Sequence, residues 1–238
     1  MKTKKLKSLV KKATGELTWS VQEAAQESGQ LRIISDSTSR THAIYLPSSP
    51  TGEETVQELL FLHELGHALL CERVHPFFSS GFPIAGLDME LIPAVAPVLS
   101  AASDWFVGQW MMEFCPDVAI GELKNEYEAT AEMMAKGETP GMDKFFVAVL
   151  ITAQSIKYLK APVECSGFLD SAVQAFLAVP PEKPSLPKLE ELINRLLSLG
   201  APFRCRHIIS QEQDVMEFYR VSEEPITTHD GGGSAQRI

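Results

Sequence analysis

Two histidines, His63 and His67, lie four residues apart within the apolar run LLFLHELGHALL, Leu59 to Leu70. Residues at this spacing are neighbours on one face of a helix, so both imidazoles can reach a single metal ion. Zinc accepts neutral imidazole nitrogen at about 2.0–2.1 Å, and two such ligands preset half of a tetrahedral site. Glu64 lies about 100° further round the helix and is poorly placed as a third ligand. It is suited instead to take a proton from a water on the metal, as metal-assisted hydrolysis requires.

The residues around this motif predict a buried amphipathic helix. Apolar side chains share the face of the two histidines at Val56, Leu59, Leu60, Leu70, Cys71 and Val74. Gly66 leaves out a side chain beside the site, where another element can pack closely. Thr51 and Glu54 have capping-box spacing, and Pro76 should end the helix near His75. The competing interpretation is a core helix whose histidines are hydrogen-bonded and bind no metal.

The sequence HELGH within LFLHELGHALL resembles the active-site helix of zincin metallopeptidases. Among these it most resembles small gluzincin-like bacterial enzymes such as the ImmA/IrrE family, over about Leu31 to Met112. The resemblance implies Zn²⁺ as the cofactor, His63 and His67 as ligands, and Glu64 as the general base. It also implies strands before the motif helix and a third protein ligand on a later helix.

The chain departs from two known variants of this pattern. The metzincin variant needs a glycine and a histidine where this sequence has Leu70 and Arg73. Gluzincins commonly place a glutamate before an Asn/Asp-x-Phe-Ala run on the following helix. Here Asp104 and Phe106 match the later positions, but Ala102 stands where the glutamate is expected.

Asp104 is the favoured third ligand. It is the sole charged residue between Leu91 and Met112, and an isolated carboxylate in so apolar a helix is costly unless a cation compensates it. Glu90 is the alternative, although acids near a helix N-terminus are favoured without any metal. Glu113 is a weaker alternative at the helix end, and Asp104 could also act by orienting a histidine.

Composition limits the classes of partner. The chain has 238 residues, 45% of them hydrophobic, and a formal net charge of −10. The acidic balance argues against nucleic-acid binding, which needs a basic face. Six lysines fall within the first twelve residues, and a solvated, frayed terminus is the favoured interpretation over a surface-binding or sorting segment. We find no secretory signal pattern, and two prolines, two serines and an aspartate make Leu91–Met112 a buried helix rather than a membrane span.

The order of predicted elements indicates an α+β fold. Strands are expected at Leu31–Ser35 and Thr41–Pro47, and possible late strands at FRCRHII and MEFYRV. Helices should follow the motif helix at 88–113, 121–136, 142–160 and 166–177, with a further short helix ending at Leu199. We divide the chain into a basic arm (1–20), a zincin-like domain (21–178), a Pro-rich connector with a C-terminal extension (179–221) and a disordered tail (222–238).

Weaker candidates complete the predicted site. Thr41–Pro47 could be an edge strand that pairs with an extended peptide, and the loop containing Phe77, Phe78 and Phe82 could line a specificity pocket or belong to the core. Side chains that could stabilise an oxyanion are Tyr45, Tyr127, Tyr158 and His207, and their spacing does not choose among them.

The predicted function is zinc-dependent hydrolysis of protein or peptide substrates in the cytoplasm, where widely spaced cysteines stay reduced. The alternative is a zincin-fold regulatory or binding module with a structural or sensory metal. A shell of four protein ligands would favour that alternative, because catalytic sites keep one position open. A protease delivered into another cell is a further possibility, and the pattern does not indicate an oligomeric state.

Overall fold

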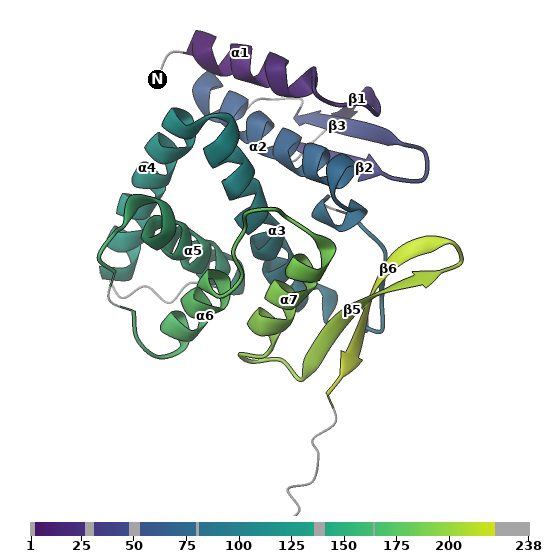
Figure 1. The fold of residues 1–238 in the computed structure, drawn as a ribbon, viewed down its shortest axis with the longest axis vertical. Helices are drawn as coiled ribbons and strands as arrows, with labels where there is room; N and C mark the ends of the chain where they lie inside the picture. Colours follow the sequence, from purple (N-terminus) through teal and green to yellow (C-terminus); the bar gives the residue numbers. More distant parts are fainter. Residues whose placement is uncertain are drawn as a thin grey trace, which may run out of the picture.

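The computed structural model describes residues 3–26, 31–47, 53–79, 81–135, 141–163 and 165–221. Within these ranges seven α-helices and two three-stranded sheets confirm the α+β class (Figure 1). The helices are α1 (Thr3–Thr14), α2 (Glu54–Arg73), α3 (Ile92–Phe114), α4 (Pro116–Ala135), α5 (Met142–Gln154), α6 (Gly167–Leu177) and α7 (Leu186–Leu197). A 3₁₀ turn, η1 (Pro76–Phe78), follows α2, and a π-helical turn, η2 (Ser155–Leu159), extends α5.

The first sheet holds β1 (Ser20–Gln26), β2 (Arg32–Asp36) and β3 (Thr41–Pro47) in the order β1-β3-β2. The two strands predicted in this region are confirmed, and they form a hairpin in which β2 pairs antiparallel with β3. β1 pairs parallel with the other side of β3, which makes β3 the central strand. The prediction that Thr41–Pro47 is an edge strand for a peptide is therefore wrong, because both of its sides are already paired. The edge nearest the motif helix is β2.

The second sheet lies at the other end of the molecule, beside α7 (Figure 1). It consists of β4 (Ile84–Ala85), β5 (Phe203–Ser210) and β6 (Gln213–Arg220), so both late strands are confirmed. One hydrophobic core contains side chains from α1 through β6. Among the described residues, no helix is both long and apolar enough to cross a bilayer. The predicted tail, 222–238, lies outside the described residues.

The basic N-terminal segment forms a helix that packs on α2. Leu6, Val10 and Ala13 of α1 are buried on one face, and their spacing of four and three residues is that of an amphipathic helix. The lysines face outward, and Lys7 pairs with Glu54. The expected solvated terminus is thus wrong for residues 3–14, because an apolar stripe lies between the lysines.

Helix α2 begins later than the capping-box spacing predicts. Its N-cap is Glu53, whose side chain makes no capping hydrogen bond, and Thr51 lies outside the described residues. The predicted end is close to the observed one, since α2 ends at Arg73, shortly before Pro76. This helix lies between the first sheet on one side and α3 on the other (Figure 1).

A buried carboxylate on α2 fastens the helix to the sheet. Glu72 accepts hydrogen bonds of 2.9 Å from the backbone amides of Thr18 and Trp19, and its Oε1 lies 2.8 Å from Nε2 of His42 on β3. His42 is fully buried, and its Nδ1 lies 2.8 Å from the hydroxyl of Ser35 on β2. Burial would raise the pKa of Glu72, but a hydrogen bond of 2.6 Å from the hydroxyl of Thr18, together with those from the two amides and His42, lowers it to about 2. Glu72 is therefore a charged anchor between the helix and the sheet.

A missing side chain lets α2 approach α3. A Cβ atom at Gly66 would lie 2.8 Å from the ring of Trp110 and 2.9 Å from a methyl group of Val107. Both distances are shorter than ordinary van der Waals contact. The predicted close approach at Gly66 is therefore present, and α3 is the element that uses it.

Replacement of Gly66 by alanine should push α2 away from α3. We expect Gly66→Ala to destabilise the protein by about 1–3 kcal/mol, the usual range for overpacking a core. Gly121→Ala in α4 is the matched control, because nothing lies within 4 Å of its Cβ position, and it should stabilise by about 0.5–1 kcal/mol. Urea unfolding of both variants tests this, and equal stabilities would contradict it.

The Glu72 anchor should give stability a defined pH dependence. A carboxyl with a lowered pKa in the folded state adds stability above about pH 4.5, and loses it as the pH falls toward about 2. We expect Glu72→Gln to reduce the free energy of unfolding by on the order of 2–3 kcal/mol at pH 6. The deficit should shrink at each step below pH 4.5. Glu191→Gln, from an exposed pair with Arg195, should change stability little at any pH.

Candidate metal centre

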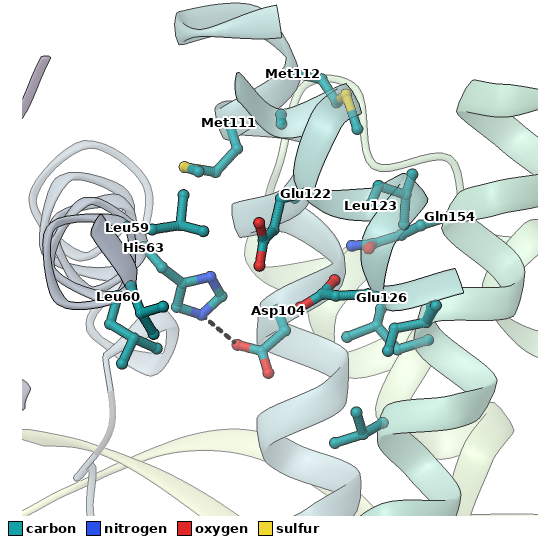
Figure 2. Close-up of a pocket in the computed structure, with 16 residues that line it drawn as sticks. Leu59, Leu60, His63, Asp104, Met111, Met112, Glu122, Leu123, Glu126 and Gln154 are labelled. Carbon is teal, nitrogen blue, oxygen red and sulfur yellow. Dashed lines mark hydrogen bonds and ion pairs between the residues drawn. The ribbon is translucent and has the colours of Figure 1, made fainter. Parts of the chain in front are cut away.

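His63, His67 and Asp104 converge where α2 faces α3. Oδ1 of Asp104 lies 2.9 Å from Nε2 of His67 and 3.2 Å from Nε2 of His63. The two histidine nitrogens lie 3.2 Å apart. Figure 2 shows the ring of His63 directed from α2 toward the Asp104 carboxylate on α3. The structure therefore brings together the three residues that the sequence predicts as metal ligands.

Backbone and aromatic packing orient this group. Nδ1 of His67 donates a hydrogen bond of 2.8 Å to the carbonyl oxygen of Phe78 in η1. The ring of Phe78 packs edge-on against that of Phe106, at 5.4 Å between centroids. Trp105, beside Asp104, is fully buried and donates from its indole nitrogen to the carbonyl of Val179. The turn after α2 thus fixes His67, and buried neighbours on α3 fix Asp104.

The protonation of His67 shows what this group requires. A carbonyl can only accept, so Nδ1 of His67 carries hydrogen, and neutral His67 presents a lone pair at Nε2. That lone pair faces a carboxylate oxygen at 2.9 Å, which is repulsive unless a positive charge lies between them. Burial would lower the pKa of His67, but the hydrogen bond and charge of Asp104, with the charge of Glu64, raise it. The pair therefore needs a proton or a metal ion.

The pKa of Asp104 follows the same logic. Burial would raise it, but hydrogen bonds from His63 and His67 lower it well below the usual range of a carboxyl. A carboxylate held in its charged form beside two imidazoles is a suitable ligand set for a divalent cation.

The spacing of these atoms fits a small cation. Ligand atoms about 2.0–2.1 Å from a tetrahedral zinc lie roughly 3.3 Å apart, close to the 2.9–3.2 Å found here. No fourth histidine, cysteine or acid of the described residues joins the group. The side chain of His63 keeps 35% of its surface exposed against 9% for His67, so the group is accessible from the side of His63.

Glu64 lies between this group and the sheet. Its Oε2 accepts a hydrogen bond of 2.8 Å from the backbone amide of Ile33 on the edge strand β2. Within the described part of the chain, Oε1 has no hydrogen-bond partner. The charge of Glu64 acts on His67, so the carboxylate is close to the candidate ligands. One oxygen is thus bound to the strand, and the other is available to accept a proton.

A cavity of about 260 Å³ adjoins the group on the side of His63. His63 and Asp104 form part of its wall, and α4 contributes Glu122 and Glu126 (Figure 2). The rest of the wall is mostly apolar, from Leu59 and other residues of α2, α3, α4 and α5. The sequence pattern alone does not distinguish these two glutamates as site residues. Their four-residue spacing indicates that they share one face of α4, but α4 also carries acids on its other faces, so the spacing does not single them out.

A second group joins the end of α2 to the β5–β6 hairpin, where His75, His207 and Asp214 offer three possible ligand atoms. Oδ1 of Asp214 lies 2.7 Å from Nε2 of His207 and 3.5 Å from Nε2 of His75. The Nδ1 of His75 accepts from the amide of Phe77, so Nε2 carries hydrogen and can donate to Asp214. Burial also lowers the pKa of His75. An N–H group from each imidazole can satisfy this carboxylate without any ion.

The other predicted candidates lie away from the cavity. Glu90 is exposed before the start of α3, and Glu113 accepts from Gln109, so neither joins the histidines. Phe77 and Phe78 are core residues, as the alternative interpretation of their loop holds. None of the four possible oxyanion-stabilising residues, Tyr45, Tyr127, Tyr158 and His207, belongs to the described cavity wall.

Comparisons with protein families, with curated proteins and with solved structures find no match to this chain.

If Asp104 is a ligand, Asp104→Asn should remove it with little change in shape. We expect zinc affinity to fall by more than about 100-fold, beyond the 10–100-fold loss typical of a residue that only orients a ligand. Glu90→Gln is the matched control and should retain zinc. Zinc titration against a competing chelator measures the affinity of both variants. Loss of zinc in Glu90→Gln but not in Asp104→Asn would show that Glu90, and not Asp104, is the third ligand.

His207→Ala tests whether the second group contributes to metal content. Because its donors and acceptors already pair, we expect the wild type and this variant to bind the same single equivalent of zinc.

Proposed function

We propose that this protein is a zinc-dependent metallopeptidase similar to the zincins, with His63, His67 and Asp104 as the metal ligands. The observation that carries the proposal is the cluster of three possible ligand atoms within 3.2 Å of one another, beside a cavity large enough for a side chain. Zinc held there would supply a Lewis acid and make a bound water a good nucleophile at neutral pH.

The surroundings of Glu64 support a role as the general base in this reaction. It follows His63 directly, and the amide of Ile33 holds one of its oxygens. This leaves the second oxygen to take a proton and fixes the orientation of the carboxylate. The edge strand β2, next to Glu64, is also the strand on which an extended peptide could lie.

The alternative is a regulatory or binding module that uses the same metal without hydrolysis. Three protein ligands and an adjoining cavity favour catalysis, because structural zinc sites usually have four protein ligands. All four cysteines are unpaired, which supports the proposal of a reducing compartment such as the cytoplasm. The proposed substrate is a peptide or protein.

Glu64→Gln separates the two functions. The amide oxygen of glutamine can still accept from Ile33, so β2 should stay in place, but the base is lost. We expect unchanged zinc content and a decrease in kcat of about 10²- to 10⁴-fold on peptide substrates. A mixed peptide library analysed by mass spectrometry provides the substrates and the assay.

His63→Ala is the comparison variant, and it should lose both zinc and hydrolysis. Full turnover by Glu64→Gln would rule out Glu64 as the base. A wild type that binds zinc but cleaves no peptide in the library would favour the regulatory module.

A further inference from the structure

Two carboxylates project into the cavity opposite the candidate ligands. Glu122 and Glu126 are four residues apart on α4, so they occupy one face of that helix. Figure 2 shows both side chains directed into the space between α4 and His63. The charges of His63 and Asp104 both act on Glu126, which places it near the candidate metal group.

These carboxylates have no cationic partner in the described part of the chain. Neither forms an ion pair or a hydrogen bond there, although other acids of the protein do, such as Glu182 with Lys157. The loss of hydration raises the pKa of Glu126, and the charge of Glu122 raises it further. Glu122 is half-buried and Glu126 is exposed, so a cationic ligand can reach both side chains and offset the repulsion between their like charges.

The remaining wall is apolar and suits an aliphatic stem. Leu59 and Leu60 of α2 face Leu123 of α4, and Leu150 and Ile151 of α5 contribute further hydrocarbon. The volume of about 260 Å³ lies just below the usual range of ligand pockets, roughly 300–1,000 Å³. It is suited to one amino-acid residue rather than to a folded domain.

We propose that this cavity selects a substrate residue with a cationic nitrogen on an apolar stem, held by Glu122 and Glu126 next to the scissile bond. The proposal rests on the proposed peptidase function. The cation has two possible sources in a peptide, the side chain of lysine or arginine and the α-amino group of an N-terminal residue. Both provide N–H donors for charge-assisted hydrogen bonds to carboxylates.

Four zinc-chelating probes distinguish these sources without any need for turnover. Lysine hydroxamate carries both cations, and norleucine hydroxamate carries the α-amine alone. Nα-acetyl-lysine hydroxamate carries the side-chain amine alone, and Nα-acetyl-norleucine hydroxamate carries neither. Binding to the zinc-loaded full chain is measured by calorimetry at pH 7.5. We expect at least one singly cationic probe to bind about tenfold more tightly than Nα-acetyl-norleucine hydroxamate, as one charge-assisted bond typically provides.

Variants of Glu122 and Glu126 test whether these two side chains cause the preference for cationic probes. Glu126→Gln and Glu122→Gln should each reduce the preference for the cationic probe, while binding of Nα-acetyl-norleucine hydroxamate and zinc content stay unchanged. A role in stability alone would weaken all four probes equally. Glu128→Gln is the matched control, since this exposed residue of α4 lies outside the cavity wall, and it should keep the full preference.

The outcomes separate this proposal from the peptidase function. Equal binding of all four probes to zinc-loaded protein would overturn the selectivity and leave the metal centre intact. Loss of zinc in Glu126→Gln would also overturn it, because Glu126 would then be a metal ligand. Failure of the wild type to bind zinc or any hydroxamate would overturn both proposals.

Discussion

The site depends on the need for a positive charge between Nε2 of His67 and the carboxylate of Asp104, beside which Nε2 of His63 is a third possible ligand atom. The Phe78 carbonyl fixes the hydrogen of His67 on Nδ1, so the Nε2 lone pair faces the Asp104 carboxylate at 2.9 Å. A core that excluded cations would separate these groups or replace them with apolar side chains. Buried packing around Trp105 and Phe106 instead holds Asp104 in place. The arrangement is therefore suitable for a cation, and a proton would compete with a metal ion for it.

The two faces of α2 serve different purposes. Toward the sheet, carboxylates two helical turns apart, Glu64 and Glu72, bond to β2 and β3. Toward α3, the helix presents the histidines and the bare backbone of Gly66. Hydrogen bonds on one face and close packing on the other fix the position of α2 along its axis and its rotation about that axis. Because imidazoles must be placed to within fractions of an ångström to share an ion, both sets of contacts bear on the chemistry.

Much of this could be predicted from local patterns. The spacing of His63 and His67 on one helix and the isolation of Asp104 on another predict three residues that do converge, because each signal arises within a single helix. β1 was missed, since its sequence SVQEAAQ lacks the β-branched alternation of a strand and depends on pairing with β3. Glu126 is not apparent from the sequence because only the packing of α4 against α3 and α5 distinguishes it from an ordinary surface acid. Tertiary neighbours, not spacing, decide such cases.

The group that orients His67 belongs to the main chain, and this affects how the site can change over evolution. No side-chain replacement at Phe78 removes its carbonyl oxygen, so the hydrogen bond to Nδ1 tolerates drift in residue identity. It is sensitive instead to the path of the backbone between the end of α2 and η1. An insertion or deletion in this short connection would rotate the carbonyl away and release the imidazole. Variation in loop length here, more than variation in residue type, should accompany loss of the site.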